Sequence, residues 1–302
     1  MKNHAKRDWR KYNRNLVNRG SITLWLEEET LASWIEKSGK RGRPSFSKAV
    51  IQTGWILKTV YRLPLRALQG FLDSLLKIIK TNLKAPHYSL FCKRAKEAEA
   101  VLPKLSNKRP TELAIDSSGL KISGEGEWKV KIHGTEKRRG WIKLHIGVDP
   151  HTQDLVVAEI TNDKVGDATV LPLLMDRAPK SIKKVLADGA YDTLGCRRYL
   201  SSKYIEECIP PQRNGRLRKE QGYEERNTAI TLMSFFGGDA EAHSLWKKLT
   251  GYHKRSLAET SFSRLKRLFG ERLSCKKFSN LKTETLFRCH ALNRMNSIRT
   301  VK

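Results

Sequence analysis

The order of β-rich and helical segments between residues 112 and 209 restricts the possible folds of this chain most strongly. The order is three strands (112–115, 141–148 and 154–161), a helix (167–175), a strand (183–187), a helix (196–202) and a strand (204–209). A crossover helix after a three-stranded meander returns the chain so that the fourth strand lies parallel to the first and beside it. We therefore expect a mixed sheet flanked by helices.

Two aspartates stand next to the strands that this order makes neighbours. Asp116 follows the run 112–115, and Asp188 follows the run 183–187. The carboxyl ends of parallel strands meet at the same edge of a sheet, so we expect both side chains at that edge. The layout matches a ribonuclease-H-like fold, with a mixed five-stranded sheet and an insertion at about 210–245.

Other aspartates follow strands as well, and a single aspartate there is more often a turn or cap residue than a ligand. Asp149 precedes Pro150 and ends an antiparallel strand, which favours a turn. Asp163 and Asp167 are interpreted as turn and helix-cap residues. Asp192 is a closer rival of Asp188, although it comes four residues later.

The segment from Tyr252 to Lys266 contains neither Pro nor Gly and is predicted to be helical. At about 100° per residue, Tyr252, Arg255, Glu259 and Lys266 fall within a stripe about 60° wide, beside an apolar stripe. An acid flanked by cations at the border of a buried face suits a carboxylate that binds a metal next to a phosphate chain. The alternative is a surface ion pair, because Arg255 and Glu259 have i,i+4 spacing.

Three carboxylates from distant parts of the chain would form one hard oxygen site. Asp116, Asp188 and Glu259 suit Mg²⁺ or Mn²⁺, which bind carboxylate and phosphate oxygens. Two such ions about 3.5–4 Å apart can support in-line phosphoryl displacement without a protein nucleophile. We therefore expect two Mg²⁺ or Mn²⁺ ions as cofactors.

The charge of the chain indicates a polyanionic partner. Fifty-nine Lys and Arg residues against thirty-one Asp and Glu residues give a net charge of +28. The excess covers both parts of the chain, with 24 basic and 8 acidic residues in 1–110 and 35 and 23 in 111–302. Such a field attracts nucleic acid, and a basic membrane surface is the less favoured alternative.

The N-terminal part is predicted to be helical and to bind DNA. After a basic arm at 1–44, the sequence predicts helices at 48–62, 65–80 and 89–100, the first capped by Ser47 or Ser45. The third helix is cationic and carries Lys93 and Arg94. Three helices within 45–105 fit an all-α, helix-turn-helix-like domain. An ordinary helical subdomain with a solvated basic face is the alternative.

Cysteine usage and hydropathy bear on the compartment. The five cysteines are widely spaced and form no C-x-x-C pair, which disfavours a zinc ribbon and suits a reducing cytoplasm. No apolar run approaches the length of a membrane span, and no apolar segment follows the basic N-terminus. We therefore expect a cytoplasmic protein without a membrane partner.

Several motifs, in the same order, resemble the DDE transposases of bacterial insertion sequences. Tyr252, Arg255, Glu259 and Lys266 match the signature Y-x₂-R-x₃-E-x₆-K of these enzymes. Further motifs are similar to insertion-sequence family five, over about residues 45–296. They are Leu63–Leu72, Ala114–Lys121, Gly124–Lys129, His133-Gly134, Lys143–His145, Ala187–Asp192 and Leu292–Met295.

The resemblance implies a function for each part. Asp116, Asp188 and Glu259 would be the catalytic, metal-binding residues, and Tyr252, Arg255 and Lys266 would contact the DNA of the element ends. The domain at 106–302 would be catalytic, and the N-terminal domain would recognise terminal inverted repeats. The implied protein is a bacterial, nucleoid-associated enzyme that cleaves double-stranded DNA, joins it to a target and assembles as a homo-oligomer on DNA.

Two alternatives stay open at the level of sequence: a non-catalytic DNA-binding regulator, and a ribonuclease-H-like nuclease that cuts without joining. Arg213 and Arg216 lie in a basic, glycine-broken stretch of the insertion, which we interpret as a loop that contacts DNA. A solvated loop is nearly as good an interpretation. Trp246 is assigned to packing in preference to stacking on an unpaired base.

Overall fold

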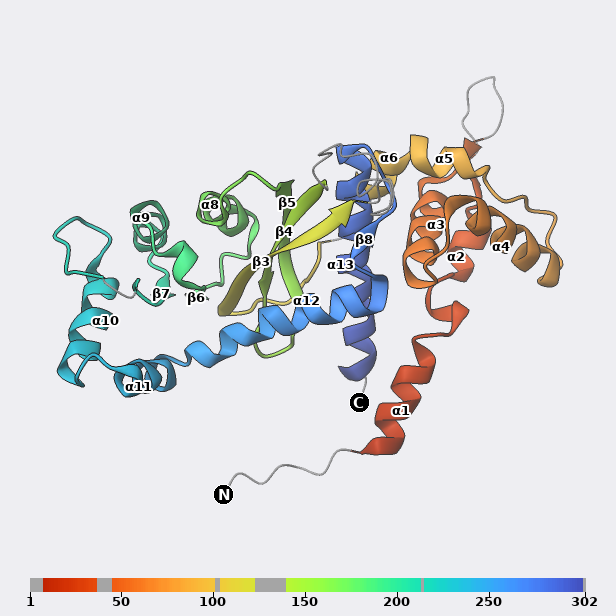
Figure 1. Cartoon of the computed structure of the whole chain (residues 1–302). Helices are drawn as coiled ribbons and strands as arrows, with labels where there is room; N and C mark the ends of the chain where they lie inside the picture. The colour runs from red at the N-terminus through yellow and green to blue at the C-terminus, as the bar shows by residue number, and fades with distance from the viewer. Residues whose placement is uncertain (1–7, 37–44, 101–103, 123–139, 213–214, 301–302) are drawn as a thin grey trace, which may run out of the picture. The chain divides into compact units, whose positions relative to one another are not determined.

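A computed structural model describes residues 8–36, 45–100, 104–122, 140–212 and 215–300 (Figure 1). The chain divides into two compact units. The helical unit comprises Met1–Pro103 and Leu273–Lys302, and the sheet unit comprises Lys104–Arg272. The residues after 272 thus group with the N-terminal helices. The domain limits 1–44, 45–105 and 106–302 remain predictions.

Helices make up most of the helical unit, together with one short antiparallel strand pair that an all-α prediction does not contain. Helix α3 begins after Ser47, whose hydroxyl accepts the N–H of Val50 at 3.3 Å, so the predicted cap is confirmed. The elements are α1 (Trp9–Asn18), η1 (Ile22–Leu24), α2 (Glu28–Ala32), β1 (Ile35–Glu36), β2 (Ser45–Phe46), α3 (Lys48–Val60), α4 (Leu65–Ile78), α5 (Tyr88–Lys93), α6 (Ala95–Ala100) and α13 (Phe278–Thr300).

The prediction of one helix over 89–100 is wrong, because the chain breaks at Arg94 into α5 and α6. Arg94 has φ −101° and ψ 18°, outside helical geometry. Its guanidinium donates to the carbonyl of Phe46 at 2.6 Å and to Glu97 at 2.7 Å. A contact with residue 46 leaves no trace in local periodicity, so the break could not be predicted from the sequence.

Helix α13 completes the core of the helical unit. The rings of Trp55 and Phe287 are stacked with centroids 5.8 Å apart, and both side chains are fully buried. Lys58 of α3 forms a buried ion pair with Glu284 of α13, 3.3 Å from Nζ to Oε1. Burying each large apolar side chain contributes on the order of 1.5–3 kcal/mol, so α13 is integral to this unit.

The sheet unit is built on a mixed sheet in the order β5-β4-β3-β6-β7, with β8 paired to β3. The predicted mixed sheet is confirmed, although it has six strands and not five, because the short β8 was not foreseen. Strands β3 and β6 are neighbours and parallel, and β3 and β4 are antiparallel, as predicted. The strands are β3 (Glu112–Ile122), β4 (Trp141–Val148), β5 (Leu155–Asn162), β6 (Lys184–Leu186), β7 (Glu206–Cys208) and β8 (Arg272–Leu273).

The helices of the sheet unit cover both faces of the sheet (Figure 1). Leu113 and Ile115 of β3 point into a cluster that includes Leu171 of α8 and Leu200 of α9. Helix α12 packs against β3 and β4 with its apolar stripe. The elements are α8 (Asp167–Arg177), η2 (Gly189–Tyr191), α9 (Leu194–Ser202), α10 (Glu224–Phe235), α11 (Ala240–Thr250), η3 (Tyr252–Arg255) and α12 (Ser256–Phe269).

The predicted insertion at 210–245 corresponds to a loop after β7 followed by α10 and most of α11. Trp246 of α11 is buried and packs with Leu186 and Met233, so its assignment to packing is confirmed. Asp167 is the first residue of α8 and not its cap, which is Gly166. Within the described residues, no helix combines the length and apolarity that a membrane crossing requires.

Candidate active site

The sequence suggested that Asp116 follows the end of its strand. In the structure, Asp116 lies inside strand β3. Antiparallel pairing with β4 continues through Asp116-Ser-Ser-Gly119, with Asp116 opposite Ile146 and Gly119 opposite Lys143. Gly119 allows close approach of the Trp141 ring, which an added Cβ would meet at 3.0 Å. The strand therefore extends to Ile122.

Asp116 and Asp188 lie at the same level of two neighbouring strands. The parallel register pairs Ala114 of β3 with Leu186 of β6, and each aspartate comes two residues later. Residues two apart on a strand share a face. Leu186 belongs to a cluster with Trp246 and Tyr252, on the face opposite the α8–α9 core. The two carboxylates thus lie side by side on one face of the sheet. Asp188 follows the end of β6, whereas β3 continues past Asp116, so the predicted proximity is found but the predicted edge position holds for Asp188 alone.

Glu259 of α12 and Arg255 of η3 lie near these carboxylates. The guanidinium of Arg255 lies 3.6 Å from Oδ2 of Asp116 (Nη1) and also pairs with the carboxylate of Glu259. The i,i+4 ion pair that the sequence left as an alternative is therefore present. Arg255 also holds Asp116, so the pair is part of the site and not a separate surface feature.

Tyr252 does not lie on the same helix as Glu259, so the prediction of one continuous helix over 252–266 is wrong. Gly251 has φ +72° and ends α11 in the left-handed conformation, and 252–255 form a 3₁₀ turn before α12. The ring of Tyr252 packs on Trp246 at 5.5 Å. Burial raises the pKa of Tyr252 and keeps its hydroxyl protonated as a donor.

The electrostatics of Asp116 show that the three acids are neighbours. Burial raises the pKa of Asp116 above its usual range, and the charges of Asp188 and Glu259 raise it further. The N–H of Ser117, 2.9 Å from Oδ1, and the charge of Arg255 act in the opposite direction. Burial is the largest of these effects, and the charge of Arg255 acts more strongly than that of either other acid alone. A further cation at this group would favour its ionised form.

The three acids nevertheless do not form a preassembled metal centre. Across the described ranges of the chain, no three His, Cys, Asp or Glu side chains are grouped closely enough to hold a metal ion. Glu259 is more than half exposed, with 55% of its side chain accessible, and its carboxylate forms an ion pair with Arg255. The donor set is right for Mg²⁺ or Mn²⁺, but gathering it requires Glu259 to leave its guanidinium partner.

A buried hydroxyl next to the acids was missed at the sequence level. Tyr191 is 1% exposed, and its hydroxyl has no hydrogen-bond partner among the described residues. Burial raises the pKa of Tyr191, and the charges of Asp167, Asp116 and Asp188 raise it further. An unsatisfied buried hydroxyl is rare in a folded protein. The Tyr191 side chain packs in the cluster of α8 and α9, so it lies within electrostatic reach of the acids and not in contact with them. Its position three residues after Asp188 was the only signal in the sequence.

Asp192, the rival of Asp188, has a structural role. It is 9% exposed and forms ion pairs with Arg197 (2.8 Å) and Arg226 (3.1 Å). Arg197 also pairs with Glu207 of β7. This network joins α9, β7 and α10, so it holds the insertion to the sheet. Asp149 likewise accepts from His151 N–H and Thr152 Oγ1, both at 2.8 Å, which confirms its turn role.

The other residues that were predicted to contact DNA come from several parts of the chain. Lys266 lies in the last turn of α12 and is partly exposed. Lys93 is exposed at the end of α5, whereas Arg94 is tied to Phe46 and Glu97. Arg216 is exposed, and its carbonyl accepts from Arg226 at 2.7 Å. Arg213, Gly124–Lys129 and His133-Gly134 lie outside the described residues.

Comparison with known proteins identifies the family. A family model described as "Transposase DDE domain" matches residues 107–294, and a second model with the same description matches residues 17–125. A solved structure, the cryo-EM structure of the piggyBac transposase synaptic complex with hairpin DNA, is similar with a TM-score of 0.45. The identity is 9%, over 96% of this chain and 75% of that chain, and a likeness this weak carries no weight here.

The first of these family models covers more than half of the chain and includes the strands, the insertion and helix α12. The matched range includes Asp116, Asp188 and Glu259. The chain therefore belongs to the family of transposases with a DDE domain.

Proposed function

We propose that this transposase binds the terminal inverted repeats of an insertion sequence of family five, cleaves the phosphodiester at each end and joins the freed 3′-hydroxyl to target DNA. The observation that carries the proposal is the placement of Asp116 and Asp188 at one level of the parallel strands β3 and β6, with Glu259 within electrostatic reach. The strand order supports a ribonuclease-H-like fold for the sheet unit.

Asp116, Asp188 and Glu259 would hold two Mg²⁺ or Mn²⁺ ions. When bound, such ions activate an attacking oxygen and neutralise the leaving oxygen of an in-line displacement. The residues of the chain supply position and charge. Asp116 and Asp188 are fixed by backbone N–H donors from Ser117 and Ala190, at 2.9 and 3.0 Å. Glu259 is the adjustable member, because it is exposed and held by a single ion pair.

Arg255, Tyr252 and Lys266 would hold the DNA strand beside the acids. Arg255 presents a planar fork suited to a phosphate, and its position beside Asp116 brings that phosphate to the carboxylates. Tyr252 can donate its hydroxyl to a phosphate oxygen. Lys266 adds a point charge about two helical turns from Glu259 on α12. A net charge of +28 supports double-stranded DNA as the partner.

The decisive experiment supplies duplexes carrying the inverted repeats that flank the gene, with Mn²⁺, to the wild-type chain and to Asp188→Asn. We expect end cleavage by the wild type, none by Asp188→Asn or Glu259→Gln, and unchanged affinity of both variants for the ends. Retained cleavage would remove the substituted residue from the metal site. Binding without cleavage by the wild type would favour the non-catalytic regulator.

A second assay separates the transposase from a nuclease that only cuts. A duplex that already carries the exposed 3′-hydroxyl end is mixed with a supercoiled target plasmid and Mn²⁺. We expect a joined product that depends on Asp188. Cleavage in the first assay without joining in the second would favour the plain nuclease. Synapsis of two ends calls for a homodimer or larger assembly, which light scattering on the DNA complex would show.

A further inference from the structure

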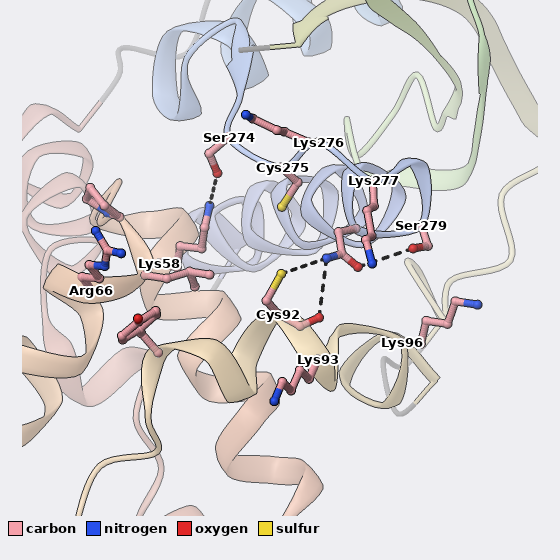
Figure 2. A pocket seen from close by; sticks show the side chains of 14 residues that line it. Lys58, Arg66, Cys92, Lys93, Lys96, Ser274, Cys275, Lys276, Lys277 and Ser279 are labelled. Carbon is pink, nitrogen blue, oxygen red and sulfur yellow. Dashed lines mark hydrogen bonds between the residues drawn. The ribbon is translucent and has the colours of Figure 1, made fainter. Parts of the chain in front are cut away.

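A pocket of about 900 Å³ lies within the helical unit, between α4, α5, α6 and the start of α13 (Figure 2). Five exposed cations line it: Arg66, Lys93, Lys96, Lys276 and Lys277. We call it the cationic pocket. Neither Asp nor Glu is among its lining residues, and none of the five cations forms an ion pair with another described residue. Five like charges around one hollow repel one another, so the pocket favours an anionic occupant.

The floor of the cationic pocket is held in place by buried interactions. Lys58 is tied to Ser274 Oγ at 2.8 Å and to Glu284, so its ammonium group is already engaged within the protein. Asn280 donates its amide to Cys92 Sγ at 3.0 Å, as the dashed lines in Figure 2 show. Lys93 and Lys96 belong to α5 and α6, and Lys276 and Lys277 to the segment before α13. Lys93 and Lys96 therefore line the pocket from one wall, Lys276 and Lys277 line it from another, and Arg66 lines it from α4.

We propose that the cationic pocket binds the phosphodiester backbone of duplex DNA without reading its sequence. The proposal rests on the proposed function, which makes DNA the substrate, and adds a second contact surface to it. Lysines meet phosphates as point charges. Asn280, which could pair with a base edge, is buried and bonded to Cys92, and Arg66 lies over the Tyr88 ring at 5.1 Å, which leaves its N–H groups able to donate to a phosphate.

The first test measures binding of the full-length chain to duplex DNA by fluorescence anisotropy, without divalent metal, between about 50 and 200 mM NaCl. Lys93→Gln/Lys96→Gln should weaken binding about equally for two unrelated sequences. The slope of log K against log[NaCl] should become shallower by about 1.8, since each lost phosphate contact removes about 0.9. Lys276→Gln/Lys277→Gln, on the other wall, should have the same effect.

The matched control is Lys77→Gln/Lys84→Gln, which removes two exposed charges of the same unit outside the pocket. We expect it to leave the slope unchanged, and we expect equal melting temperatures for all variants. An equal loss in the control would show that total charge matters and would overturn the proposal. So would an unchanged slope in both pocket variants, a sequence-dependent loss, or binding to phosphatidylserine vesicles with none to DNA.

A footprint provides a second readout. All five cysteines are described, and only Cys92, which lines the pocket, is exposed. Saturating duplex DNA should slow alkylation of Cys92 by N-ethylmaleimide, and Cys92→Ser should remove the labelled product. Unchanged alkylation on bound DNA would overturn the proposal. Because neither test requires cleavage, failure here with normal Asp188-dependent cleavage would leave the proposed function intact.

Discussion

At the scale of single residues, Arg255 is the centre of the candidate active site. Its guanidinium lies between Asp116 and Glu259 and close to the Tyr252 ring, 5.9 Å away. Burial acts to lower the pKa of Arg255, but the negative neighbours raise it, so the charge is permanent. One cation therefore keeps two acids together before any metal or DNA arrives.

Replacing Arg255 tests whether its guanidinium binds a DNA phosphate in addition to pairing with Asp116 and Glu259. Arg255→Ala should weaken end binding and flatten its salt slope by about 0.9, the share of one phosphate. Arg255→Lys is the control, since it keeps the charge and loses the fork, so its slope should stay near wild type while cleavage falls. A slope that is unchanged in Arg255→Ala would mean that Arg255 acts only within the protein.

The sequence located the acids but not their geometry. Asp116 and Asp188 were found because strand order fixes which strands are neighbours. The strand was predicted to end at residue 115, whereas pairing with β4 keeps it extended to Ile122, because the partner strand and not the local composition sets where β3 ends. The 3₁₀ turn at Tyr252 follows Gly251, which lies just before the segment 252–266 and interrupts the helix from outside its periodic pattern.

At the scale of elements, strand β4 and helix α3 were predicted well and α5–α6 was not. The alternating run 141–148 and the cap at Ser47 are local signals, and both are confirmed. The break at Arg94 depends on a carbonyl 48 residues away. The grouping of α13 with α3 depends on the partners of Trp55 and Lys58, which no single-segment pattern contains.

Gly251 and Gly70 should respond oppositely to alanine. Gly251 has φ +72°, where a Cβ costs about 1 kcal/mol, so Gly251→Ala should destabilise the protein and misplace Tyr252. Gly70 lies inside α4 with no atom within 4 Å of an added Cβ, so Gly70→Ala should stabilise it by about 0.5–1 kcal/mol. Urea unfolding measures both. Equal effects would mean that the turn at Gly251 is not maintained in solution.

Glu284 should make the stability of the helical unit sensitive to acid. Burial acts to raise its pKa, but Lys58, Arg288 and the N–H groups of Ser274 and Cys275 lower it to about 2. A lowered carboxyl pKa stabilises the fold above the unfolded value of 4.5, and this contribution is lost as the pH falls from 4.5 towards about 2. The contribution is roughly 3 kcal/mol at neutral pH.

Glu284→Gln tests this dependence. The variant should lose several kcal/mol, about 3–5, because two buried cations lose their partner, and its stability should vary less between pH 4.5 and 2. Urea unfolding across that range measures the change. The control is Glu29→Gln, which removes an exposed carboxylate of α2 and should preserve the wild-type pH dependence. An unchanged pH profile in Glu284→Gln would show that Glu284 is not the group that titrates.

At the scale of the whole molecule, the chain leaves the helical unit at Pro103 and re-enters it at Leu273. A chain that ends at Arg272 should therefore lose the folded state of residues 45–100, although that segment is intact. Limited proteolysis with mass spectrometry should find new cleavage in α3 and α4, where the full chain is protected. Protection of α3 and α4 in the shortened chain would show that the N-terminal helices are stable without α13.

The same connectivity has a consequence during translation. Trp55 and Lys58 emerge from the ribosome early, but Phe287 and Glu284 are made only after the entire sheet unit. At about 5–20 residues per second, the exposed surface of α3 waits on the order of ten seconds or more for its cover. The segment that is synthesised first is thus the last to complete its fold. During this time the apolar surface of α3, in a strongly basic chain, remains exposed to solvent next to the ribosome.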